Sequence, residues 1–153
     1  MATHFDGTEC ERQALDLLVK LTRAAAAVEA AAAKSLVGSG ITLSQFGVLD
    51  ALYHLGDLSL GALAVKHLRS PNNMTSVVDT MERAGLVRRT RSESDRRSFT
   101  VCLTSKGRAA FEEVWPRHLE TIQSAMAGVS PEEKRDLSDL LKKLGVFAAN
   151  SIK

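Results

Sequence analysis

The chain has 153 residues, enough for one module, and 44% of them are apolar, which is ample for a core. Aromatic residues make up only 5%, so the core must be built from Leu, Val and Ala. No apolar run is long enough to span a bilayer, and the polar residues 1–11 lack the apolar stretch of a signal peptide. We therefore expect a cytoplasmic protein without a membrane contact.

The net charge of +2 is unevenly distributed along the chain. Residues 66–108 contain 10 Lys and Arg against 4 Asp and Glu, a net charge of +6, whereas the remainder carries −4. A segregated positive charge favours contact with a polyanion. Because an ordinary solvated basic face has the same composition, the charge alone does not decide between these two interpretations.

Cys10 and Cys102 are far apart in the sequence and match no metal-binding spacing, so we expect two free thiols. The histidines are scattered as well, at His4, His54, His67 and His118. A metal site would have to be assembled across the fold. The sequence therefore predicts no metal and no cofactor.

The first predicted helix covers residues 11–37. Leucines at helical spacing lead into the alanine-rich stretch 24–33, whose small side chains allow close approach of another helix. Thr42 and Gln45 form a capping box for a second helix that ends near Leu55. A short extended segment and a third helix, residues 60–67, follow.

Ser70 and Pro71 are strong signals for the start of a fourth helix, since serine caps free amides and proline suits the first helical position. Its apolar stripe consists of Met74, Val77, Val78 and Met81. The opposite face is polar and includes Asn72, Asn73, Thr75 and Ser76. Gly85 ends the helix.

Residues 87–91 and 99–103 alternate with a period of two and predict a two-stranded hairpin. Its polar tip carries Arg96 and Arg97, either of which could enter a narrow minor groove. Asp95 can orient the Arg97 guanidinium through a charge-assisted contact. A solvated turn with an incidental ion pair is the alternative for this tip.

Two long helices complete the chain. Thr104 caps the first of them, and Pro116 inside it predicts a kink. Ser130 and Glu133 form a capping box for the last helix, which ends near Asn150. The element order from residue 42 to residue 104 is therefore that of a winged helix-turn-helix.

The helix after Ser70 suits the major groove, because Asn pairs bidentately with adenine and a Thr methyl contacts the thymine methyl. The same polar face would be merely solvated on an ordinary helix. The candidate DNA-contacting residues are Ser70, Pro71, Asn72, Asn73, Thr75 and Ser76 on the helix, and Asp95, Arg96 and Arg97 on the hairpin.

These segments resemble the MarR family of bacterial regulators. The wing pattern of that family is Asp-x-Arg, three residues, then Val-x-Leu-Thr, and it is filled here by Asp95, Arg97, Val101, Leu103 and Thr104. Residues 82–87 match the family's run between recognition helix and wing. The resemblance extends over nearly the whole chain, because the family flanks its winged domain with one N-terminal and two C-terminal helices.

The resemblance implies a mainly α fold with a small β-wing, as a single module over residues 1–153. Residues 42–104 would form the winged helix-turn-helix part, and residues 11–37 and 105–150 the dimerisation helices. The partners implied are a second copy of the chain and a near-palindromic operator in double-stranded DNA. Arg97 is then the wing arginine and Asp95 its support, whereas Arg96 is a candidate phosphate contact.

The resemblance also implies a transcriptional regulator, a repressor that a small aromatic or phenolic ligand releases from DNA. Tyr53, His54, Trp115 and His118 are candidates to approach such a ligand crevice, although each residue type is more often packed or solvated. The ligand-binding residues are otherwise unknown. Some relatives sense oxidants through a cysteine in the first helix, but Cys10 lies upstream of the expected position.

A winged domain that binds protein and an enzyme are the two alternatives to a DNA-binding regulator. A winged domain that binds protein instead of DNA would not need the +6 segment and the two tip arginines. The sequence has no nucleophile elbow, phosphate-binding glycine loop or zinc-protease motif, so we do not expect an enzyme.

Overall fold

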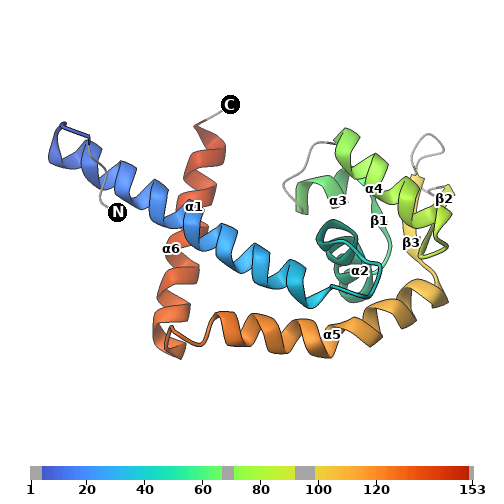
Figure 1. The fold of residues 1–153 in the computed structure, drawn as a ribbon. Helices are drawn as coiled ribbons and strands as arrows, with labels where there is room; N and C mark the ends of the chain where they lie inside the picture. The colour runs from blue at the N-terminus through green and yellow to red at the C-terminus, as the bar shows by residue number, and fades with distance from the viewer. Residues whose placement is uncertain (1–4, 67–70, 92–98, 152–153) are drawn as a thin grey trace.

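A computed structural model describes residues 5–66, 71–91 and 99–151 (Figure 1). The predicted sites Ser70, Asp95, Arg96 and Arg97 lie outside these residues. Three long helices are α1 (Glu9–Ser35), α5 (Ser105–Ala125) and α6 (Pro131–Asn150). The remaining elements are α2 (Leu43–Leu55), β1 (Leu58–Ser59), α3 (Leu60–Lys66), α4 (Pro71–Arg83), β2 (Val87–Arg91) and β3 (Phe99–Leu103). Figure 1 shows these shorter elements gathered at one end, with α6 crossing α1 at the other.

Side-chain caps set the first residues of α1, α2, α5 and α6. The predicted capping boxes at Thr42 and Ser130 are confirmed, and the Thr104 side chain accepts a hydrogen bond from the Gly107 amide as expected. The first helix begins at Glu9, two residues earlier than predicted, because Thr8 forms a capping box with Glu11 that the sequence analysis did not consider.

The sheet has three antiparallel strands in the order β1-β3-β2. The predicted hairpin of β2 and β3 is confirmed, with Val87 opposite Leu103 and Arg91 opposite Phe99. The extended segment before α3 adds a third strand, because Leu58 pairs with Val101. The sheet thereby ties the chain before α3 to the hairpin after α4.

The core lies between α2, α3, α4, α5 and the sheet. On α4 the predicted stripe is confirmed, since Met74, Val78 and Met81 have no exposed surface. Full burial of each such side chain stabilises the fold by about 1.5–3 kcal/mol. They share the core with Leu49, Leu63, Val101 and Phe111, which are at most 1% exposed. This packing fixes the rotation of α4 about its own axis.

The turn from α4 into β2 is closed by both backbone and side chains. Gly85 has a φ of +73°, its amide donates to Glu82 O, and the Leu86 amide donates to Met81 O. This is the Schellman ending that glycine favours. From the start of α5, the Thr104 hydroxyl donates to the carbonyls of Gly85 (2.7 Å) and Leu86 (3.0 Å).

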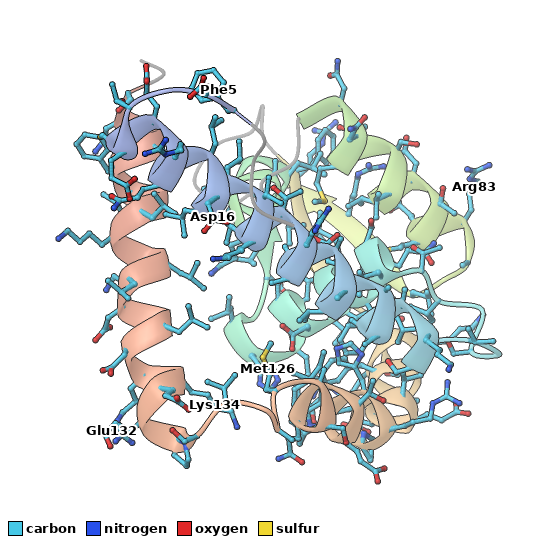
Figure 2. All side chains as sticks on the ribbon, turned by 60° about the vertical axis from the view of Figure 1, so that its left-hand side comes forward. Phe5, Asp16, Arg83, Met126, Glu132 and Lys134 are labelled. Carbon is cyan, nitrogen blue, oxygen red and sulfur yellow. The ribbon has the colours of Figure 1, made fainter. Side chains whose placement is uncertain are left out.

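Helix α6 is built differently from the core helices. None of its residues, all of which are described, is buried, although it carries the predicted leucine stripe. Figure 2 shows α6 at the left edge of the molecule, with side chains projecting to both sides of the ribbon. No helix in the described ranges is both long enough and apolar enough to cross a bilayer.

We predict that Gly107→Ala lowers the free energy of unfolding by about 1–3 kcal/mol, the usual cost of overpacking. A Cβ atom at this position would lie 2.0 Å from the Leu86 carbonyl oxygen, a backbone atom that cannot move aside alone. Urea unfolding measures the change. Gly61→Ala in α3 is the matched control, because only the Ser59 hydroxyl lies near its Cβ position, at 3.9 Å. An equal effect of the two substitutions would contradict the close approach.

Candidate nucleic-acid interface

The polar face of α4 is exposed to solvent. Asn72, Asn73, Thr75 and Ser76 are all exposed, in the first two turns of the helix. Their orientation follows from the burial of Met74 and Val78 on the other side. The sequence analysis predicted this division of the helix correctly. The structure thus presents a helix face of Asn, Thr and Ser, the residue types that pair with base edges.

The hairpin lies beside α4. Strand β2 packs against α4, and β3 pairs with β2 up to the Arg91–Phe99 pair at the edge of the tip. The tip residues Asp95, Arg96 and Arg97 lie outside the described part, so their contacts stay a prediction. The exposed Arg91 adds positive charge next to the tip, and the exposed Arg88 adds it near the other end of β2.

Several basic residues of the 66–108 segment are already engaged within the protein. The Lys106 ammonium donates to Ala84 O at 2.8 Å, and the Arg108 guanidinium lies 4.8 Å from the centre of the Tyr53 ring. Arg89 forms ion pairs with two carboxylates of α4. The net charge of +6 therefore overstates the number of cations available to phosphate.

Arg83, by contrast, extends outward from the C-terminal end of α4 (Figure 2). Among the described residues its guanidinium makes two hydrogen bonds, both 3.4 Å long, to Asp79 O and to the Thr80 hydroxyl. Such contacts are weak. Arg83 thus lies on the exposed side of α4, where a cation can reach a phosphate.

The four residues predicted near a ligand crevice come together between α2 and α5. The Trp115 ring centre lies 5.8 Å from that of His54 and 6.4 Å from that of His118. Tyr53 and His54 contact each other at 5.1 Å. Phe46 and Phe111 complete the cluster, with the Phe111 ring 5.3 Å from Trp115 and 4.5 Å from Tyr53. Four members of this cluster were predicted from the sequence, whereas the two phenylalanines were not.

His118 joins this aromatic cluster to α1. It is 8% exposed, and its Nδ1 lies 2.8 Å from the hydroxyl of the buried Ser35. That hydroxyl donates its proton to Ala32 O at 2.7 Å, so we infer that His118 Nδ1 carries a proton and donates to it. Burial lowers the pKa of His118 below its ordinary value, while the charge of Asp50 acts in the opposite direction. Burial thus favours the neutral form of the ring.

Polar groups border the cluster on its outer side. The Tyr53 hydroxyl donates to Glu112 Oε1 at 3.0 Å, and the His54 ring lies 3.5 Å from an Asp50 oxygen. The rings themselves pack against the hydrophobic core, so the predicted role of this cluster in ligand binding stays a prediction. The sequence could not show that Glu112 on α5 meets Tyr53 on α2.

The two cysteines are unpaired, as predicted. Cys10 is exposed near the start of α1, whereas Cys102 is buried in β3. Burial raises the pKa of the Cys102 thiol, which lowers the fraction of reactive thiolate. Among the described residues no group of three or more His, Cys, Asp or Glu could hold a metal ion.

Comparison with known proteins supports this arrangement. The family model for the MarR family matches residues 41–99. The uncharacterized HTH-type transcriptional regulator YkoM of Bacillus subtilis is 33% identical over 97% of this chain and 96% of its own length.

Two solved structures are also similar. Bordetella bronchiseptica BpsR, whose DNA binding is regulated by 6-hydroxynicotinic acid, has 29% identity and a TM-score of 0.76 over 84% of this chain and 98% of its own. Rhodococcus jostii CouR, solved with p-coumaroyl-CoA, has 25% identity and a TM-score of 0.77 over 84% and 91%. Sequence, fold and element order agree, and the chain belongs to the MarR family of transcriptional regulators.

Proposed function

We propose that this regulator is a homodimeric repressor that binds a near-palindromic site in duplex DNA. The observation that carries the proposal is the exposed Asn, Thr and Ser face of α4, which a buried stripe holds next to an arginine-bearing hairpin. In a two-fold dimer the two copies of α4 would enter successive major grooves, about one helical turn apart. Each wing would then reach the flanking minor groove.

Each group of residues has a different role in this proposal. Asn72, Asn73, Thr75 and Ser76 contact base edges, while Ser70 and Pro71 place the start of α4 at the backbone. Arg97, oriented by Asp95, enters the minor groove, and Arg96 contacts phosphate. Repression follows if the operator overlaps a promoter.

We predict that Arg97→Ala weakens binding to the selected operator about tenfold and leaves the dimer intact, because one groove contact is lost from each wing. Fluorescence anisotropy with a labelled duplex measures the affinity. Arg135→Ala, an exposed substitution on α6, removes the same charge far from α4 and should leave the affinity unchanged. Equal affinities of the Arg97 and Arg135 variants would refute the wing assignment.

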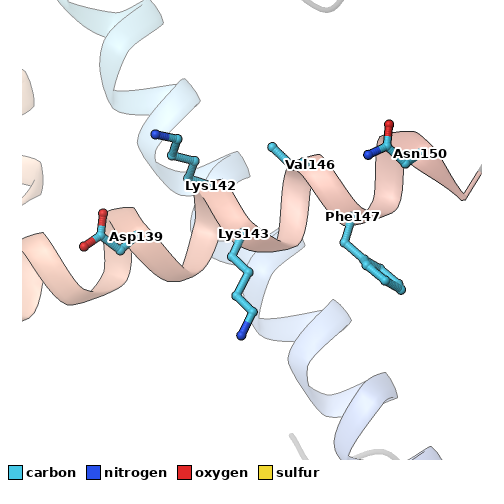
Figure 3. Close-up of a pocket in the computed structure, with 6 residues that line it drawn as sticks. All are labelled: Asp139, Lys142, Lys143, Val146, Phe147 and Asn150. Carbon is cyan, nitrogen blue, oxygen red and sulfur yellow. The ribbon is translucent and has the colours of Figure 1, made fainter.

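The dimer proposal rests on the apolar surfaces of α1 and α6. Leu140 is 63% exposed and Phe147 74% exposed, and both border a groove of about 440 Å³. Its lining consists of Leu17 of α1 and of Leu137, Leu140, Leu141, Lys143, Leu144 and Phe147 of α6. Figure 3 shows Phe147 and Lys143 on one side of α6, with α1 crossing behind. A contiguous leucine surface on a helix without buried residues is typical of a subunit interface. In the proposed dimer, the same leucines of a second copy would pack against it.

We predict that Leu140→Glu converts the dimer to monomer, since it places a charge in the apolar interface. Sedimentation equilibrium gives the mass of the species in solution. Ser138→Glu lies on the same helix outside the groove and should leave the dimer unchanged. A dimer of undiminished stability in the Leu140 variant would place the interface elsewhere.

We also propose that a small aromatic acid or phenol releases the protein from DNA by binding at the cluster of Tyr53, His54, Trp115 and His118. The support is the set of stacked rings with polar groups at their border. In the similar proteins above, 6-hydroxynicotinic acid regulates DNA binding by BpsR and CouR binds p-coumaroyl-CoA, and both compounds contain an aromatic ring. A ligand that spreads α2 from α5 would also move α4, because α2 packs against both helices.

We predict that 6-hydroxynicotinate or p-coumarate lowers DNA affinity and quenches the fluorescence of Trp115, the single tryptophan of the chain. Both signals should saturate at the same ligand concentration, because one binding event causes both. Release by peroxide instead, lost in Cys10→Ser, would favour an oxidant sensor. If none of these compounds changes either signal, the proposed ligand class is wrong.

A further inference from the structure

Arg89 of β2 is held between two carboxylates of α4. Its Nη2 lies 2.5 Å from an Asp79 oxygen, and its Nη1 lies 3.0 Å from Glu82 Oε2. Only 20% of the Arg89 side chain is exposed, whereas Asp79 and Glu82 are 46% and 38% exposed. The two acids are three residues apart and therefore share one face of α4. The guanidinium lies across that face.

Glu82 holds Arg89 in two ways. One carboxylate oxygen accepts from the Arg89 side chain, and the other accepts from the Arg89 backbone amide at 2.8 Å. A single carboxylate thus fixes both the main chain of β2 and the side chain that points back to α4. The planar, forked guanidinium can bridge two acids at once, which a lysine ammonium cannot do with the same geometry.

Strand alternation separates Arg89 from its neighbour Arg88. Arg89 pairs with Val101 on the core side of the sheet, whereas Arg88 is exposed on the outer side. The two arginines are adjacent in the sequence, yet only one of them is available to a phosphate. The charges at Arg89 are already balanced by Asp79 and Glu82 within the protein.

We propose that Arg89 is a positioning residue that locks the wing to the recognition helix, and that it makes no phosphate contact. The proposal rests on the DNA-binding function proposed above. The wing and α4 must reach neighbouring grooves together, so their relative orientation limits the affinity. Without the Arg89 side chain the hairpin keeps its turn at Gly85 and the backbone hydrogen bond to Glu82, but it loses both ion pairs with the α4 carboxylates.

The test compares Arg89→Met with Arg88→Met on a duplex that the wild-type protein selects from random-sequence DNA. Affinity is measured over a series of salt concentrations, because the slope of log affinity against log salt counts the phosphate contacts. We expect Arg89→Met to weaken binding about tenfold with an unchanged slope. Arg88→Met should instead lower the magnitude of the slope by about one for each arginine lost from the complex.

Two further variants separate positioning from electrostatic repulsion and from misfolding. Arg89→Lys keeps the positive charge but loses the forked guanidinium that bridges both acids. The DNA affinity of this variant should therefore fall, with an unchanged salt slope. Glu82→Gln in the Arg89→Met background removes the carboxylate that the first substitution leaves without its ion pair. Restored DNA affinity in this double variant would mean that repulsion between Glu82 and the DNA phosphates, not loss of positioning, caused the weaker binding. Continued weak binding of that double variant supports the lock.

The results also separate this inference from the function on which it rests. A smaller salt slope in Arg89→Met, equal to that of Arg88→Met, would overturn the positioning role and leave DNA binding standing. Full affinity of Arg89→Met would overturn it in the same way. A wild-type protein that selects no duplex would overturn both proposals.

Discussion

The burial of one face of α4 determines most of the arrangement that follows. Met74, Val78 and Met81 are completely buried, so the helix cannot rotate without exposing them to water. The residues on the opposite face of the helix, Asn72 and Ser76 among others, consequently face outward. The Schellman ending at Gly85 and the Thr104 hydroxyl then direct the chain into β2, which places the hairpin beside the same helix. A polar helix and an adjacent wing thus follow from one packing constraint.

The two ends of the molecule differ in how much of their apolar surface is buried within the single chain. The winged part buries its own core, whereas α6 has no buried residue in the single chain. Helix α5 connects the two ends, since it packs on α1 and α2 and carries both Trp115 and His118. The hydrogen bond between His118 and Ser35 joins α5 to α1 at the edge of the aromatic cluster. A ligand in that cluster would act where the helices meet.

Local signals in the sequence predicted the helices and strands of the winged part well. Caps at Thr42 and Ser130 and the strand period after Gly85 depend on neighbouring residues, so they can be recognised without the fold. The short extended segment before α3 was predicted, but its pairing with β3 was not, because the contact of Leu58 with Val101 joins distant segments.

The candidate site was predicted less completely, and for the same reason. The polar face of α4 follows from helical spacing, but the meeting of Glu112 with Tyr53 depends on how α5 packs on α2. The number of charged residues in the sequence could not show that Asp79 and Glu82 balance the charge of Arg89, since these acids lie on the other side of the turn between α4 and β2.

The central claim is that two copies of α4 read duplex DNA as a symmetric pair. Fragments of the organism's own genome that the protein enriches should be sequenced and then footprinted with hydroxyl radicals. We expect a near-palindromic sequence with two protected half-sites about one helical turn apart, on one face of the duplex. Enrichment without a shared sequence, or a single protected half-site, would contradict the account.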